Sequence, residues 1–287
     1  MEYEDGYADL HLHSNRSDGY LSPRELIDKC VGHGFKAIAI VDHDDISAYQ
    51  EISGYGRTRD IEVITGVELS VCFRNDDIHI LGYGFDCYDS DLIGYLDLFK
   101  EERIKRARKI VENLAKLGMP ISFEAVLKKA GTGSIGRPHI AKVLVDEKYV
   151  HHFQEAFNRY LGDGKPAHFD KYQIDLSTAV RLIAKAGGVS VLAHPGLRLT
   201  FQHAEEIIKY GLDGIEVIHP RHNLESMRTF KDFAQQNGLL ETGGSDYHGG
   251  DRGDMVLGKY KIPYDAVIRI KERIATLGIS IDKDRLG

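Results

Sequence analysis

The pattern of apolar and polar positions at the start of the chain predicts a strand, a helix and a second strand. The stretches "YADLHLH" and "KAIAIVDH" have the alternating or continuous apolar pattern of strands. Between them, "SPRELIDKCVGHG" has helical periodicity, with Ser22 as the N-cap and Gly34 as the stop. This order predicts a β-α-β unit.

The rest of the chain continues this pattern with one interruption. "IEVITGVELSV" and "DIHILGYGF" are predicted as two strands joined by a short polar turn. Residues 89–170 then carry only amphipathic helical patterns, including a long charged helix that begins near residue 90. The alternation of strands and helices returns near residue 171, with the further strands "VSVLAHPG", "DGIEVIHP" and "LLETGGSD".

The resulting count of seven strands predicts an α/β fold, a distorted TIM-like (β/α)7 barrel with an all-helical insertion. We expect residues 1–88 and 171–287 to form the barrel. Residues 89–170 would form the helical insertion, or cap domain, placed after the fourth predicted strand.

Composition and charge restrict the class of protein. The chain has 287 residues, 42% of them apolar, and a net charge of −7, which argues against binding long nucleic acid through counterion release. Its start has no basic segment followed by an apolar one, and no apolar run is long enough for a membrane span, so we expect a cytoplasmic protein with no membrane partner. Its three cysteines show no CxxC spacing and suggest no disulfide framework.

Histidines and carboxylates gather at the predicted carboxyl ends of the strands, which is the functional face of such barrels. One His-x-His pair, in "DLHLH", would more often be a solvated or core pair than a metal site. Here six histidines and three carboxylates are expected around one mouth, and divalent cations would offset the repulsion between unpaired carboxylates. These nine side chains are more than one metal ion can bind, so we expect two or three ions at this site. The candidate metal ligands are His11, His13, Asp18, His43, Glu68, His79, His194, Asp246 and His248.

The motifs that carry these residues resemble those of the PHP (polymerase and histidinol phosphatase) metallophosphoesterases. They occur in the family's order over the predicted barrel: "DLHLHSNRSDG", "IVDHD", "GVELS", "IHILGY", "LAHPG" and "GGSDYHG". The helical insertion with "GRPHIAKVL" resembles the branch that includes RNase AM and the 3′,5′-nucleoside bisphosphate phosphatases.

This resemblance implies a trinuclear metal site and a reaction. One ion would take His11, His13, Glu68 and Asp246. A second ion would share Glu68 and add His79 and His194, and a third would take Asp18, His43 and His248. The family uses manganese, iron or zinc, and mixed nitrogen and oxygen ligands suit all three. The implied reaction is hydrolysis of a phosphate ester by a metal-bridging hydroxide.

Three further residues are candidates for catalytic or substrate contacts. Arg137 and His139 follow a Gly-rich segment at a predicted helix start, where arginine and a helix N-terminus both favour phosphate, and the resemblance places them as phosphate contacts from the cap. The alternative is a surface arginine and a helix-capping histidine. His222, like His219, follows the sixth predicted strand, and either could support a ligand, contact the leaving group or be structural.

We therefore expect a metal-dependent phosphoric ester hydrolase acting on a small nucleotide, such as a 3′,5′-nucleoside bisphosphate or a short oligonucleotide. The alternatives within this class are histidinol-phosphate, sugar-phosphate and cyclic-phosphate substrates. A metal-dependent amidohydrolase is a less favoured alternative, because the chain offers no plausible bridging lysine. A metal-binding scaffold without catalysis is disfavoured by the complete ligand set.

Overall fold

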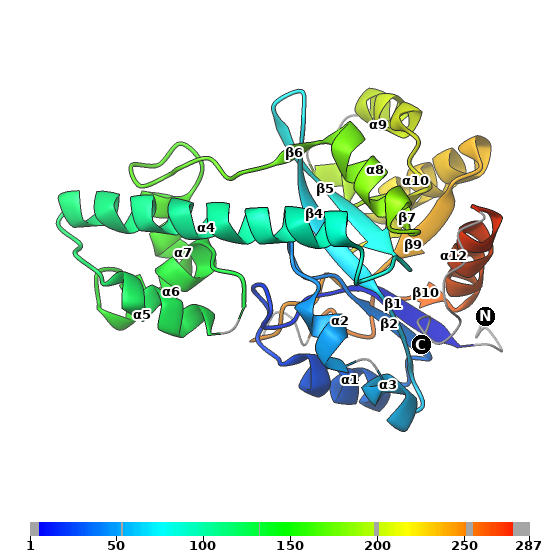
Figure 1. Cartoon of the computed structure of the whole chain (residues 1–287), viewed down its shortest axis with the longest axis horizontal. Coiled ribbons are helices and arrows are strands. Elements are labelled where there is room, and N and C mark those ends of the chain that lie inside the picture. The colour runs from blue at the N-terminus through cyan, green and yellow to red at the C-terminus, as the bar shows by residue number, and fades with distance from the viewer. Residues whose placement is uncertain (1–5, 53, 132, 198–200, 251–254, 278–287) are drawn as a thin grey trace. The chain divides into compact units, whose positions relative to one another are not determined.

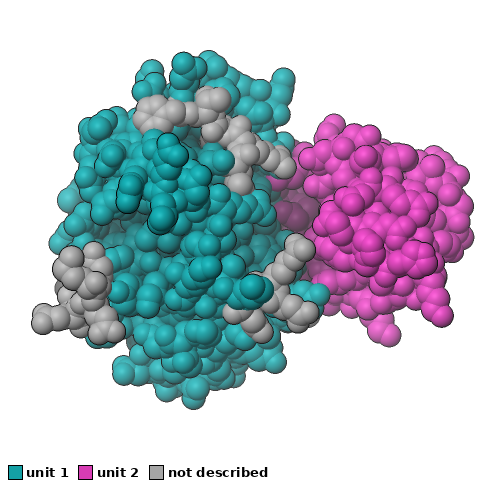
Figure 2. Space-filling view, turned by 180° about the vertical axis from the view of Figure 1, so that it is seen from behind, with its two compact units in different colours: residues 1–94, 173–287 teal, residues 95–172 magenta. Residues whose placement is uncertain are grey.

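The computed structural model describes residues 6–52, 54–131, 133–197, 201–250 and 255–277. The chain divides into two compact units, coloured separately in Figure 2. The first unit contains residues 1–94 and 173–287, and the second contains residues 95–172. No helix among the described residues is long and apolar enough to cross a membrane.

The first unit contains two sheets, and the smaller one has the strand order β10-β1-β2-β3. Strands β1, β2 and β3 are parallel, and β10 pairs with β1 in the antiparallel direction. These strands are β1 (Tyr7–Leu12), β2 (Ala37–Ile40), β3 (Glu62–Ile64) and β10 (Ile262–Pro263). The helices that connect the parallel strands are α1 (Pro23–Gly32), α2 (Ser47–Ile52) and α3 (Tyr55–Thr58).

The sequence explains why α1 begins at Pro23. The Ser22 hydroxyl accepts a hydrogen bond from the backbone N–H of Glu25, and the Glu25 carboxylate accepts one from the backbone N–H of Ser22. This reciprocal capping satisfies two backbone donors that a helix start leaves without partners. Leu26, Ile27 and Cys30 form the buried face of the helix. Helix α1 therefore leads the chain back to the start of β2, as the sequence pattern predicts.

The larger sheet has the strand order β6-β4-β5-β7-β8-β9. Strand β5 runs antiparallel to both of its neighbours, β4 and β7, while β7, β8 and β9 are parallel. These strands are β4 (Gly66–Phe73), β5 (Asp76–Tyr83), β6 (Ile174–Asp175), β7 (Val189–Leu192), β8 (Gly214–Ile218) and β9 (Leu240–Gly243). The helices of this part are α8 (Leu176–Lys185), α9 (Phe201–Ile207), α10 (Leu224–Asn237) and α12 (Asp265–Thr276), with 3-10 turns at Pro195–Leu197 and Ile208–Tyr210.

Helices cover the outer faces of the strands, as Figure 1 shows for α8, α10 and α12. Helix α8 packs on β4, β5 and β7, helix α10 packs on β8 and β9, and helix α12 packs on β7, β9 and β10. A cluster of buried apolar side chains forms the core between the strands and α12. It includes Leu10, Ala39, Leu81, Val191 and Ile270. Burial of such side chains contributes on the order of 1.5–3 kcal/mol each.

The predicted mixed α/β architecture is confirmed, but the pairing of the described strands gives two sheets and not a closed TIM barrel. One predicted strand, "IEVITGVELSV", is in fact two, because β3 ends at Ile64 and β4 starts at Gly66 in the other sheet. A side chain at Gly66 would lie 2.6 Å from Val41, so this sharp passage between sheets requires glycine. Isolated bridges at Leu12–Tyr247 and His43–Glu68 are the points where the two sheets pair.

The second unit is built of helices only among its described residues. Its elements are α4 (Ser90–Lys116), which begins in the first unit, α5 (Phe123–Ala130), α6 (Arg137–Asp146), α7 (Phe153–Ala156) and a π-helical turn at Phe157–Leu161. An apolar core of its own joins these helices, and it includes Ile110, Leu114, Val126, Ile140 and Leu144. Such a core is what a unit needs in order to be compact by itself.

Candidate metal centre

Strand β1 brings two imidazoles to one end of the smaller sheet. His11 lies in β1 and His13 follows its last residue, and both side chains are fully buried. The backbone N–H of His13 donates to the carbonyl of Tyr247 (2.9 Å), which keeps the chain extended past the end of the strand. The two rings therefore share one face, with centroids 5.2 Å apart.

Glu68 of β4 lies at the centre of the histidines and is 1% exposed. Its carboxylate oxygens lie within 3.4 Å of ring nitrogens of five histidines: His11, His13 and His43 at Oε2, and His79 and His194 at Oε1. Burial disfavours the ionised carboxylate, but His43, His79 and His11 outweigh burial and hold the pKa of Glu68 well below its usual range. Glu68 is therefore an anion that faces several potential nitrogen donors.

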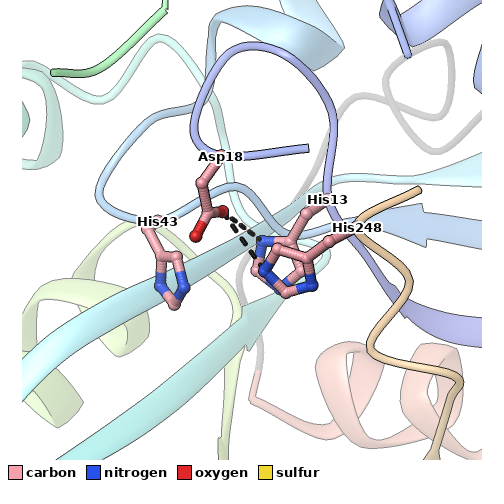
Figure 3. A group of neighbouring side chains, drawn as sticks. All are labelled: His13, Asp18, His43 and His248. Carbon is pink, nitrogen blue, oxygen red and sulfur yellow. Dashed lines mark ion pairs between the residues drawn. The ribbon is translucent and has the colours of Figure 1, made fainter. Parts of the chain in front are cut away.

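Asp18 belongs to a second group, with His13, His43 and His248 (Figure 3). One donor atom from each of these four side chains lies within 4.8 Å of the other three. Asp18 Oδ1 lies 3.2 Å from Nε2 of His248 and 3.9 Å from Nδ1 of His13, and both contacts are drawn in Figure 3. Three imidazoles and one carboxylate form a donor set that first-row divalent metals accept.

Asp246, which follows β9, completes the group around the two β1 histidines. Its Oδ1 atom lies 3.5 Å from Nε2 of His11 and 3.3 Å from Nε2 of His13. The segment before Asp246 passes very close to β1, because a side chain at Gly244 would lie 2.4 Å from the backbone nitrogen of His11. Glycine at this position allows the Asp246 carboxylate to reach the histidines.

The cluster has a buried floor and a partly exposed edge. His11, His13 and Glu68 are 0–1% exposed, whereas Asp18 is 24% and His248 is 33% exposed. The most solvent-exposed part of the cluster is therefore the side of Asp18 and His248.

The chemistry of this donor set fits divalent metal ions. Both ring nitrogens of His13 are buried and form no hydrogen bond with any described residue, although Nε2 contacts Glu68 and Asp246. Buried polar atoms nearly always have a partner, and a lone pair of imidazole would be satisfied by a cation. Several side chains belong to more than one group of possible ligands, so neighbouring ions could share them.

The structure brings all nine predicted ligands into these groups. Their assignment to particular ions stays a prediction. The groups also include two side chains outside that ligand set, Glu216 and His219, which lie with His11 in a fully buried group. The sequence pattern leaves the role of His219 open and does not select Glu216. One sequence feature marks Glu216 as a candidate functional residue, because it is an acidic residue inside the otherwise apolar strand "GIEVI".

The two predicted phosphate contacts lie at the start of α6 in the helical unit. Arg137 Nη1 donates to the carbonyl of Leu161 (3.0 Å) and to Oδ1 of Asp163 (2.7 Å), while its Nε and Nη2 donors have no partner among the described residues. His139 is 5% exposed, and its Nδ1 accepts a hydrogen bond from the backbone N–H of Gly136 (3.1 Å). The capping contact of the alternative interpretation is thus present, and phosphate contact stays a prediction for both residues.

His222 is held by backbone groups. Its Nδ1–H donates to the carbonyl of Val217 (2.9 Å), and its Nε2 accepts from the backbone N–H of Gly196 (3.4 Å). Its ring also packs on Phe230, with centroids 4.9 Å apart. These contacts tie the end of β8 to the segment after His194 and favour the structural interpretation, while a catalytic role for His222 stays a prediction.

Comparison with known proteins identifies the family. Residues 9–213 match the model of the PHP domain, a range that includes seven of the nine predicted ligands. The chain belongs to the PHP domain family. The other two predicted ligands, Asp246 and His248, follow the matched range and join the same groups in space. The prediction of a PHP metal-dependent phosphoesterase is confirmed.

Two curated relatives of this PHP protein have related activities in their names. A 3′,5′-nucleoside bisphosphate phosphatase of Chromobacterium violaceum is 34% identical over 87% of this chain and 90% of its own length. A 5′-3′ exoribonuclease of Haemophilus influenzae is also 34% identical, over 92% of this chain and 98% of its own length.

Two solved structures have the same fold over nearly the whole chain. A predicted metal-dependent phosphoesterase from Bifidobacterium adolescentis superposes with a TM-score of 0.85 and 28% identity, covering 95% of this chain and 98% of that protein. A protein from Chromobacterium violaceum described as an amidohydrolase, with bound sulfate and no metal, has a TM-score of 0.81 and 30% identity. The match covers 94% of this chain and 96% of that protein.

Proposed function

We propose that this PHP protein hydrolyses a phosphate ester of a small nucleotide, such as a 3′,5′-nucleoside bisphosphate, using two to three divalent ions of manganese, iron or zinc. The observation that carries the proposal is the convergence of the nine predicted ligands around Glu68. The named activity of the Chromobacterium violaceum phosphatase, which is similar over most of both chains, supports the choice of substrate.

The residues of the centre have distinct roles in this proposal. Divalent cations bound there would lower the pKa of a bound water molecule towards about 7 and neutralise phosphoryl oxygens. Glu68 would act as a metal ligand and not as a general acid, because its pKa lies well below the usual range. His11 and His13 would hold the buried side of the metal cluster. Asp18 and His248 would hold the exposed side, where the ester arrives.

The helical unit would bind a second phosphate of the substrate. Arg137 uses one nitrogen within its own unit, so its Nε–Nη2 edge is available for a bidentate contact with phosphate. Arg103 and Arg106 lie near it, because burial, Arg137 and Arg103 together lower the pKa of Arg106 to about 10, while Asp163 and Asp170 oppose this shift. His139 would support Arg137 by capping α6, and His222 would support the metal centre through the backbone it holds.

The two sheets are proposed to be halves of one distorted barrel. The bridges Leu12–Tyr247 and His43–Glu68 support this, because the first pairs the end of β1 with the segment after β9, and the second pairs the segment after β2 with β4. If the two sheets close into a barrel at the metal centre, this would explain why histidines from both sheets contact the Glu68 carboxylate.

A short RNA with a 5′ phosphate is the second candidate substrate. The observation that favours it is the relative from Haemophilus influenzae named a 5′-3′ exoribonuclease, which this chain matches over 98% of its length. The net charge of −7 favours short over long nucleic acid. The expectation against long nucleic acid therefore stays a prediction.

A turnover screen of the manganese-loaded protein tests the proposal. The substrates would be nucleoside 3′,5′-bisphosphates, short 5′-phosphorylated RNAs, cyclic phosphates, sugar phosphates and an amide substrate, with elemental analysis of each preparation. We expect two to three ions per chain and the highest kcat/KM for a bisphosphate. Activity with at most one ion per chain, or hydrolysis of only the amide, would contradict it.

A further inference from the structure

Strand β8 and the residue that follows it carry two buried polar side chains outside the predicted ligand set. Glu216 lies in β8, His219 follows the strand, and both are fully buried. Each contacts a predicted ligand: Glu216 contacts His11, and His219 contacts Asp246. A buried charge is costly unless it is paired and hydrogen-bonded, so the partners of Glu216 explain its place in the strand.

Glu216 accepts two hydrogen bonds from the ligand histidines. Its Oε1 accepts from Nδ1–H of His11 (2.9 Å), and its Oε2 accepts from the backbone N–H of His194 (2.7 Å). A neutral imidazole carries one ring proton, so a proton held on Nδ1 leaves the lone pair of His11 on Nε2. That nitrogen faces Glu68 (3.4 Å), at the centre of the cluster.

The second bond of Glu216 acts on the backbone of His194. His194 has a φ of +28°, a left-handed conformation that costs energy for a residue with a side chain. The Glu216 carboxylate holds its N–H in this conformation, and the side chain then reaches Glu68, with Nε2 at 3.0 Å from Oε1. One carboxylate thus orients two histidines of the centre.

His219 fixes the carboxylate of Asp246 in a comparable way. Its Nδ1 accepts a hydrogen bond from the backbone N–H of Arg221 (3.1 Å), so the ring proton must lie on Nε2. Nε2–H then donates to Oδ2 of Asp246 (3.3 Å). This leaves the other oxygen, Oδ1, directed toward His11 and His13, at 3.5 Å and 3.3 Å from their Nε2 atoms.

We infer that Glu216 and His219 are positioning residues that select which atoms of His11, His194 and Asp246 face the metals. This inference rests on the proposed metal-dependent function and deepens it. Outer partners of metal ligands raise the basicity of the ligand and fix its orientation, and their loss typically lowers metal affinity or activity 10- to 100-fold. Neither residue needs to touch the substrate to have this effect.

Nitrogen NMR of histidine-labelled, zinc-loaded protein tests the atom assignment directly. The expected spectrum has His11 with hydrogen on Nδ1 and zinc on Nε2, and His219 with hydrogen on Nε2 and no zinc. Zinc on Nδ1 of His11, or hydrogen on Nδ1 of His219, would overturn the inference even if the enzyme were fully active.

Two variants test the consequence for metal binding. Glu216→Gln keeps one acceptor but turns an amide N–H₂ toward a donor, and His219→Leu removes the donor to Asp246. Each should bind manganese and zinc about 10- to 100-fold more weakly in competition with a chelator. Asp213→Asn is the matched control, since Asp213 also accepts hydrogen bonds, from the backbone N–H of Ser190 (3.0 Å) and from Arg273 (2.9 Å), before the start of β8.

Thermal unfolding of the metal-free variants separates positioning from general destabilisation. A variant that keeps the wild-type Tm but loses metal affinity supports the inference, and unchanged affinity in both variants would overturn it. Equal losses of affinity in Asp213→Asn would also overturn it. If Glu216→Gln does not fold, the metal affinity of His219→Leu and the NMR assignment test the inference instead. Wild-type protein that binds no divalent ion would instead refute the proposed function.

Discussion

Replacing Arg137 by alanine should slow hydrolysis of a nucleoside bisphosphate far more than hydrolysis of a simple ester. The substitution removes the Nε–Nη2 edge that has no partner among the described residues, and a charge-assisted hydrogen bond contributes about 1.5–3 kcal/mol. This corresponds to a loss of roughly 10- to 150-fold in kcat/KM. The ion pair with Asp163, which is 63% exposed, accounts for about 0–1 kcal/mol of folding stability at most.

The assay compares one variant on two substrates. An aryl phosphate has no second phosphate, so its kcat/KM should change little in Arg137→Ala, while the bisphosphate should show the full loss. Arg159→Ala is the matched control, because Arg159 also forms an ion pair within the helical unit, with Glu155 at 2.6 Å. Equal losses on both substrates would place Arg137 at the attacked phosphate. No loss on either would refute the reasoning.

Three further predictions concern the metal centre and the core. Asp18→Ala should lose a metal ion and most turnover but keep the wild-type circular dichroism spectrum, and wild-type activity would contradict the role of Asp18. Gly244→Ala should fold poorly, because its side chain would lie 2.4 Å from the backbone of His11; a wild-type Tm would contradict this. Native thiol titration should detect only Cys72, since the other two cysteines are buried; rapid reaction of all three would refute that.

Much of the metal centre could be predicted because its residues lie in, or a few residues after, strands with clear apolar patterns. The i, i+2 spacing in β1 places His11 and His13 on one face of the strand, and this local rule needs no tertiary information. The motif "GVELS" lies in β4 and carries Glu68, and "IVDHD" extends past the end of β2 and carries His43. Such positions depend on the strand pattern and little on the rest of the fold.

The sheet topology could not be predicted in the same way. The apolar pattern of "IEVITGVELSV" is continuous through Thr65, so it predicts one strand, whereas the chain changes sheets at Gly66. This change depends on the close approach of Gly66 to Val41, which lies in a distant part of the sequence. Periodicity reports which face of a segment is buried, but it does not report which partner strand covers it.

The hydrogen-bond and ion-pair partners of most side chains could not be predicted from the sequence pattern either. Glu216 was not selected because its two hydrogen-bond donors come from β1 and from the segment after β7. The capping role of His139 was available as an alternative, since Gly136 lies three residues earlier. The pairing of Arg137 with Asp163 required the fold of the helical unit. Local contacts were thus foreseeable, whereas individual hydrogen bonds between distant segments were not.

The charge of the centre also bears on how many ions it holds. Four carboxylates, Asp18, Glu68, Glu216 and Asp246, have pKa values held below their usual range, because surrounding histidines outweigh the effect of burial. That balance depends on protonated histidines, and bound metal ions would displace their protons. The carboxylates would then be uncompensated anions, which are costly in such a site. Two divalent cations would balance four carboxylates. Charge balance therefore supports the proposal that the centre holds more than one divalent ion.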